Sequence, residues 1–143
     1  MRLHFTVARI LLAGLACGSL AAGAADFVVV AGAASGIGPL TREQVVELFL
    51  GKARALPTGG KAILIDQPDS SPLRDAFYSK LTGRSAAQVR SLWAKMAFTG
   101  KGMPPLEGGG NEDIRKQVAG SRNMLGYIDK SALDGSVKTV FAP

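Results

Sequence analysis

The chain almost lacks the two residue types that dominate metal sites and nucleophilic catalysis. Its 143 residues include one cysteine, Cys17, and one histidine, His4. Both lie in an N-terminal stretch that we expect to be removed during export, as argued below. The rest of the chain therefore offers no disulfide, no thiolate nucleophile, no histidine-based triad and no ordinary zinc or copper site. The sequence thus predicts a non-enzyme without a cofactor, which relies on its apolar core for stability.

Long apolar runs are also scarce, and the one that stands out is near the N-terminus. Residues 10–24 (ILLAGLACGSLAAGA) are uncharged, follow Arg2 and Arg9, and end in the small residues Ala22-Gly23-Ala24. This order of basic, apolar and small segments is typical of a cleaved secretory signal. The alternative is a membrane anchor, but the run is shorter than the ~20 apolar residues that span a bilayer. We expect residues 1–24 to be a signal peptide and the protein to be periplasmic.

Cys17 leaves a second alternative, a lipoprotein signal. Such a signal would place leucine three residues before the cysteine, where this chain has Gly14. Lipidation is therefore the less favoured interpretation. The remaining residues, 25–143, are enough for one domain.

Charge gives a weaker signal. The net charge is +6, and lysine and arginine are scattered along the chain without interleaved aromatic residues. Proteins that bind nucleic acid usually gather such residues on one face. We therefore expect no nucleic-acid partner, but a solvated surface that attracts anions.

Apolar patterning and capping residues predict an alternation of strands and helices. Strands are expected at residues 26–31, 62–66, 124–128 and 136–141, and helices after Thr41, from Pro72, after Ser85 and after Asn111. Residues 99–110 are rich in Gly and Pro, which argues against regular structure there. This order predicts a small three-layer α/β sandwich with a mixed sheet.

Side chains at helical spacing mark the expected core. Phe77 lies between Leu73 and Leu81 at a four-residue spacing, and Leu92 and Trp93 fall on the inward face of the next helix. Two acids beside the second strand, Asp66 and Asp69, could be read as a catalytic pair. Because no base is evident near them, they are interpreted as surface carboxylates beside a turn.

A glycine-rich loop follows the first strand and raises a nucleotide-binding alternative. Gly32, Gly36 and Gly38 have the spacing of a dinucleotide fingerprint, in which backbone approaches a pyrophosphate at a helix start. Pro39 interrupts the place where the helix should begin. A nucleotide-dependent oxidoreductase is accordingly the remote alternative.

Five segments together resemble phosphate-binding proteins of ABC transporters, which have the type II periplasmic binding fold. The segments are LTREQVVELFLGK (40–52), PTGGKAILI (57–65), the stretch from Asp69 to Phe77 (69–77), GGGNEDIRKQV (108–118) and MLGYID (124–129). They occur in the family's order and cover most of the expected mature chain. The resemblance implies one lobe of a protein that normally has two, and a substrate-binding role for phosphate or a related oxyanion. It also implies a membrane transporter or sensor protein as partner.

The resemblance further implies an anion site where the 69–77 segment begins. Ser70, Ser71 and Arg74 would contact the anion. Ser35 and Gly36 are expected nearby for a separate reason, because ligands in open α/β sheets often bind where strands end. The chain departs from the family at this place, because Pro72-Leu73 stands for Gly-Thr and Gln67 stands for an anion-binding arginine. Ser71 is also what an ordinary helix cap looks like. The competing interpretation is a periplasmic interaction or sensor domain that has lost its ligand.

Overall fold

The computed structural model describes residues 26–143, so the expected signal peptide lies outside the described residues. The elements are β1 (Phe27–Gly32), α1 (Arg42–Phe49), β2 (Ile63–Asp66), α2 (Pro72–Thr82), α3 (Ala86–Phe98), β3 (Leu106–Glu107), α4 (Asn111–Ala119), β4 (Met124–Asp129), a 3₁₀ turn (Lys130–Ala132) and β5 (Val137–Phe141). Their order agrees with the sequence-based expectation except for β3, a two-residue strand inside the Gly/Pro-rich segment.

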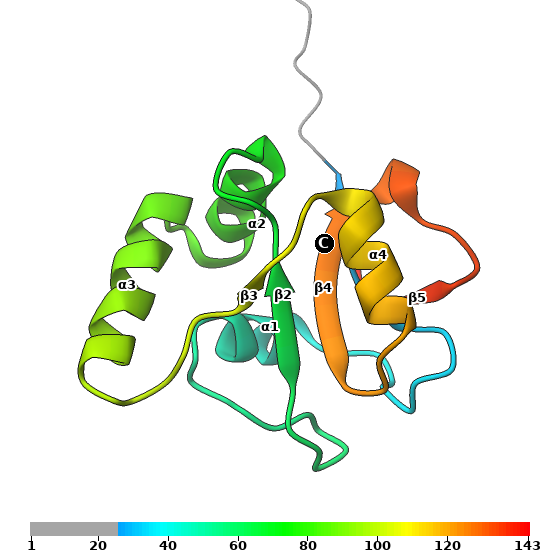
Figure 1. Ribbon diagram of the computed structural model, residues 1–143, viewed down its shortest axis with the longest axis horizontal. Helices are drawn as coiled ribbons and strands as arrows, with labels where there is room; N and C mark the ends of the chain where they lie inside the picture. Colours follow the sequence, from blue (N-terminus) through cyan, green and yellow to red (C-terminus); the bar gives the residue numbers. More distant parts are fainter. Residues whose placement is uncertain (1–25) are drawn as a thin grey trace, which may run out of the picture.

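The five strands form one mixed sheet. Their order is β3-β2-β4-β1-β5, with β2 parallel to β3 and β4, and β1 antiparallel to β4 and β5. Because β1 is antiparallel to β4, the end of β1 and the start of β4 lie at the same end of the sheet. β2 is parallel to β4, so the end of β2 lies at the opposite end of the sheet, where α2 begins (Figure 1).

Helices cover both faces of this sheet, which confirms the three-layer α/β sandwich (Figure 1). Alternate residues of β1 point to opposite faces, as the two-residue period of a strand requires. Val29 packs in the larger core with α1, α2 and α3, whereas Val28 and Val30 pack in the smaller core with α4.

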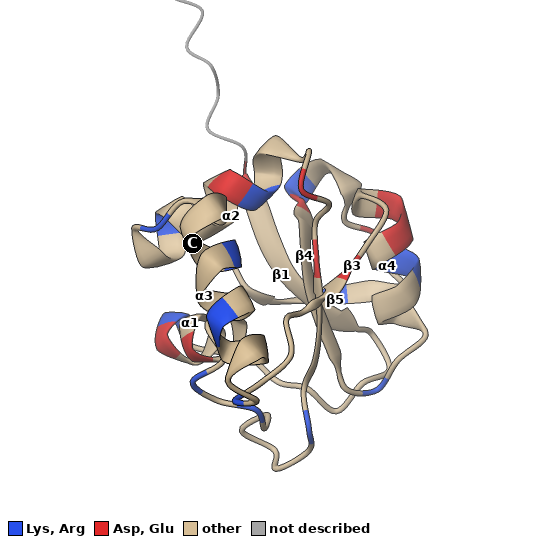
Figure 2. Ribbon diagram, turned by 60° about the vertical axis from the view of Figure 1, so that its left-hand side comes forward, with Lys and Arg blue, Asp and Glu red and all other residues tan. Residues whose placement is uncertain are grey.

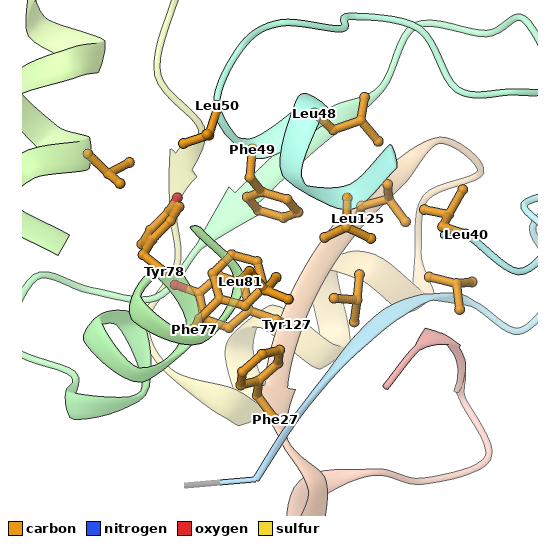
Figure 3. Close-up of a cluster of buried hydrophobic side chains, with 14 of the residues drawn as sticks. Phe27, Leu40, Leu48, Phe49, Leu50, Phe77, Tyr78, Leu81, Leu125 and Tyr127 are labelled. Carbon is orange, nitrogen blue, oxygen red and sulfur yellow. The ribbon is translucent and has the colours of Figure 1, made fainter. Parts of the chain in front are cut away.

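Aromatic rings fill the centre of the larger core (Figure 3). Phe77 of α2 stacks on Tyr127 of β4 with ring centroids 3.7 Å apart, and Phe27 and Phe49 meet Phe77 edge-on at 5.0 Å. The expected inward position of Leu92 is only partly met, because that side chain is half-buried at the margin of the core.

Local capping chemistry sets three of the four helix starts as expected. Thr41 with Gln44 and Ser85 with Gln88 form complete capping boxes, and Pro72 occupies the first turn of α2. The expected cap at Asn111 is wrong: α4 begins at that residue, and Gly110, with a φ of 119°, precedes it as the cap. The side chain of Asn111 is used elsewhere, as described below.

The sheet topology argues against the dinucleotide alternative. A dinucleotide fingerprint joins two parallel strands through a helix, whereas β1 runs antiparallel to β4 and therefore also to β2. Gly32 has a packing reason instead. A Cβ atom there would lie 2.9 Å from the backbone oxygens of Val118 and Ser121, while Gly36 and Gly38 have open space.

Candidate functional site

The most polar place in the interior is the carboxylate of Asp66, where β2 ends. Its Oδ2 accepts a hydrogen bond from the Tyr78 hydroxyl at 2.7 Å, and its Oδ1 accepts one from the Tyr127 hydroxyl. The backbone amide of Gln67 donates to Oδ1 at 2.9 Å. The residue is only 3% exposed, so its interpretation as a surface carboxylate is wrong. Three donors replace the water that burial removes.

Burial shifts the pKa values of all three groups in this cluster. Desolvation raises the pKa of Asp66, and the hydrogen bonds from the two tyrosines together with the charge of Arg74 oppose that shift. Burial also raises the pKa of Tyr78 and of Tyr127 far above the usual range, with the charge of Asp66 adding to it. The tyrosines therefore remain protonated donors, and neither is a base at neutral pH.

Arg74 connects this buried cluster to the surface. Its Nε lies 3.5 Å from Asp66 Oδ2, and its Nη1 contacts Asp69 Oδ1. Arg90, from α3, reaches the same Asp69 oxygen at 3.2 Å. The Arg74 side chain is 11% exposed, whereas those of Asp69 and Arg90 are about half exposed. Two guanidinium groups from different helices thus converge on one carboxylate.

A small cavity adjoins the two arginines. It has a volume of about 190 Å³ and is lined by Asp66, Arg74, Arg90, Trp93, Ala94, Ala97, Pro104 and Pro105. The cavity combines an apolar wall from α3 with the arginine pair. Its polar side also includes the Asp66 carboxylate, which would repel an anion.

The two expected serine contacts lie beside Arg74 at the start of α2. Ser71 precedes the helix in an extended conformation, and its side chain makes no cap hydrogen bond. Ser71 therefore occupies the N-cap position, as expected of a helix start, but its hydroxyl does not supply the cap bond. Ser70 is exposed. Pro72 has no N–H to offer, and the Leu73 side chain is buried in the core.

The Gln67 side chain points into the interior and not toward the turn before α2 where an anion would bind. The side chain is 2% exposed, and its Nε2 donates to the Tyr127 carbonyl at 3.0 Å and to Asn111 Oδ1 at 2.9 Å. Asn111 Oδ1 also accepts from the Asp129 amide at 3.0 Å. This chain of bonds ties β2 to β4 and α4, so Gln67 and Asn111 are structural residues.

The structure separates Ser35 and Gly36 from the other expected contacts. They follow β1, whose end lies at the sheet edge opposite the start of α2. Ser35 is buried, its carbonyl accepts from Lys138 Nζ at 2.7 Å, and its hydroxyl has no partner among residues 26–143. These two residues cannot join Ser70, Ser71 and Arg74 around one small anion.

Sequence reasoning missed Arg90 and the two tyrosines. Arg90 lies on the next helix, and only the packing of α3 on α2 brings it to Asp69. A tyrosine at the fourth residue of the Met124–Asp129 strand was visible, but its partner on β2 is 61 positions away. Long-range pairings of this kind leave no local pattern.

Within the described part of the chain, no group of three or more His, Cys, Asp or Glu side chains could hold a metal ion. Nor does any helix there combine the length and the apolar character needed to cross a membrane.

Solved structures provide the comparison for this arrangement. A protein of Clostridium perfringens, described as a phosphate ABC transporter substrate-binding protein with bound phosphate, superposes with a TM-score of 0.65 at 22% identity. An ABC-type phosphate transport receptor from Vibrio cholerae gives 0.63 at 21% identity, and a possible phosphate-binding protein from Planctomyces limnophilus gives 0.58 at 15%. The fold matches one lobe of such proteins.

The share of each protein that superposes shows why this chain is described as a single lobe. Each of the three superpositions covers 80% of this chain, but only 40–45% of the other protein. The chain thus spans less than half the length of the phosphate-binding proteins that it resembles. No protein-family model and no curated protein sequence matches the chain. At these identities the likeness establishes the fold, and the site must be argued from this chain's own residues.

Proposed function

We propose that this chain is an exported, non-catalytic, single-lobe substrate-binding-type domain that holds phosphate or a related oxyanion weakly at the start of α2. The observation that carries the proposal is the convergence of Arg74 and Arg90 on the Asp69 carboxylate. The geometry there already holds an anionic group, and an external oxyanion would take its place.

The physical features of this place suit an oxyanion in part. Guanidinium groups pair well with oxyanions, and the start of α2 adds the partial positive charge of a helix N-terminus. Arg74 is mostly buried, which strengthens its pairing. The hydroxyls of Ser70 and Ser71 lie on the adjoining turn and complete the donor set.

Two other features limit the affinity. The external anion must displace Asp69 and also approach the buried charge of Asp66. A single lobe further leaves one side of the anion in water. We therefore expect phosphate binding in the high micromolar to millimolar range, about −4 to −5 kcal/mol.

Removing the internal competitor provides the test. Asp69→Asn should tighten phosphate binding several-fold in calorimetric titrations at fixed ionic strength, because both arginines lose their carboxylate partner. Arg74→Gln together with Ser71→Ala should abolish the binding. Asp134→Asn is the matched control, since Asp134 pairs with Arg115 at 3.1 Å on another surface. Affinity unchanged by Asp69→Asn would contradict the site.

A second candidate is an interaction domain that has lost its ligand, acting with a membrane transporter or sensor protein. It is favoured by Gln67, which is tied into the interior, and by Pro72, which withholds a backbone donor. Pull-down from periplasmic extract with and without phosphate separates the two candidates. Partner capture that ignores phosphate, together with no phosphate binding by Asp69→Asn, would favour the interaction domain.

A further inference from the structure

A second and larger cavity adjoins the first, and Trp93, Pro104 and Pro105 line both. Its volume is about 400 Å³, which is within the range of small-molecule sites. It is lined by Leu48, Gly51, Ala53, Arg54, Lys61, Ala62, Ile63, Leu64, Trp93, Met96, Gly102, Met103, Pro104, Pro105 and Leu106. Its walls come from the end of α1, the loop after it, the start of β2, α3 and the segment before β3.

The lining is apolar and includes side chains that the fold leaves uncovered. Met103 is 79% exposed and Leu106 is 52% exposed, although both belong to the wall of this cavity. Phe98, at the end of the same α3 that supplies the wall, is 93% exposed. Exposed apolar groups beside a preformed cavity are typical of a binding site.

Both charged side chains that line this cavity, Arg54 and Lys61, are cationic. Residues 50–62 and 93–106 contain no Asp or Glu and add the cations Lys52, Lys95 and Lys101, whereas Glu47 and Glu107 flank the lining residues Leu48 and Leu106. In Figure 2 the loops at the lower end of the view carry only Lys and Arg. Of the cavity-lining pair, neither Arg54 nor Lys61 forms an ion pair within the described chain.

Arg54 is positioned rather than free to extend into solvent. Its Nη2 donates to the Lys101 carbonyl, which joins the loop after α1 to the loop after α3 across the cavity. Gly102 lies beside it, because a Cβ there would be 3.8 Å from Arg54 Nη2 and 3.5 Å from the Trp93 ring. The cation and the indole therefore border the same space.

We propose that this cavity binds a small anionic amphiphile, a free carboxylate with an apolar tail. The tail lies against Trp93, Met96 and Leu64, and the carboxylate is held by Arg54 and Lys61 at the edge of the cavity. Charge complementarity selects the anion, because a neutral or cationic molecule of the same shape leaves both cations uncompensated.

Trp93 makes the proposal directly measurable. It is the only tryptophan of the chain, and its Nε1 is fixed by a 3.0 Å bond to the Phe49 carbonyl. It lines this cavity and the smaller one, so the charge variants below assign the signal to this cavity. Titration with octanoate below its micelle concentration should change tryptophan fluorescence with a saturable curve. Octan-1-ol should bind at least about fivefold more weakly, as expected for the loss of a partly exposed charge-assisted contact, and octylammonium should bind more weakly still.

Variants separate the tail contact from the charge contact. Lys61→Gln, and separately Arg54→Gln, should weaken octanoate binding and leave octanol binding unchanged. Met103→Ser should weaken the binding of both ligands, and Lys130→Gln, on the 3₁₀ turn, is the matched control. Circular dichroism of each variant checks the fold.

Three results would overturn the proposal. They are a flat titration of the folded wild-type protein, equal affinity for octanoate and octanol, and octanoate binding untouched by both charge variants. Binding to phosphatidylglycerol vesicles without any response to monomeric octanoate would also overturn it, since the surface would then be a lipid contact.

Discussion

The Tyr78 hydroxyl lies 2.7 Å from Asp66 Oδ2, and this bond joins the middle of α2 to the end of β2. Tyr127 brings β4 to the other oxygen of the same carboxylate. A single buried acid therefore links three elements at the sheet edge where α2 begins. A buried acid lowers the free energy of unfolding when it is ionised and its hydrogen bonds do not fully replace the water that it lost.

The first prediction concerns the pH dependence of stability. Burial raises the pKa of Asp66 in the folded state, so the folded protein holds this proton more tightly than the unfolded chain does. Stability from this group is fully present below the unfolded pKa and is lost as the pH rises through the folded pKa. Asp66→Asn has no proton to lose. The difference in unfolding free energy, wild type minus variant, should therefore fall as the pH rises above 4.

Urea unfolding from pH 4 to 8 measures this difference. Asp134→Asn is the control, because that carboxylate is exposed and its pKa is lowered by the bonds from Ser136. The opposite slope, a difference that grows with pH, would mean that Arg74 and the tyrosines outweigh desolvation at Asp66.

The second prediction compares two core positions. Phe77 is fully buried and stacks on Tyr127, so Phe77→Ala should lower the free energy of unfolding by about 3–5 kcal/mol. Leu92 is half-buried, and Leu92→Ala should cost only about 1 kcal/mol. Chemical denaturation measures both. Equal losses would show that α3 packs more deeply than the structure indicates.

The third prediction is export with cleavage after Ala24 or Ala25. It rests on the basic, apolar and small-residue order of residues 2–24. Mass spectrometry of the protein recovered from the periplasm should show a new N-terminus at that place. Recovery of intact Met1, or of a lipid on Cys17, would refute it.

The parts of the fold that the sequence predicted are those with short-range causes. Thr41 with Gln44 and Ser85 with Gln88 are three residues apart, and the β-branched run of β1 is continuous, so each could be recognised locally. Asn111 shows the limit. Its residue type suits a helix cap, but its side chain serves Gln67, 44 positions away.

The same limit applies to the candidate site. Residues at the start of α2 were identified because they are contiguous, whereas Arg90 enters only through helix packing. The burial of the two acids is also set by tertiary packing. Asp66 points into the interior toward Tyr78, and Asp69 lies on the surface turn. Nothing in the sequence between them marks which acid is buried.

The last prediction uses the three glycines that resemble a nucleotide fingerprint. In a fingerprint all three would serve one loop around a pyrophosphate. Here a Cβ at Gly32 would meet the backbone oxygens of Val118 and Ser121 at 2.9 Å, and backbone atoms cannot rotate away. Gly32→Ala should therefore lower the free energy of unfolding by about 1–3 kcal/mol.

Gly36 and Gly38 are the matched controls, because nothing lies within 4 Å of a Cβ at either position. Gly36→Ala and Gly38→Ala should each change stability by less than about 0.5 kcal/mol, with a small gain where the unfolded chain loses freedom. Urea midpoints of the three variants decide the matter. A loss at Gly36 or Gly38 as large as that at Gly32, or a change in nucleotide fluorescence on adding the wild-type protein, would restore a functional reading of the loop. A loss confined to Gly32 would instead show that β1 approaches the end of α4 and the turn after it too closely for any side chain.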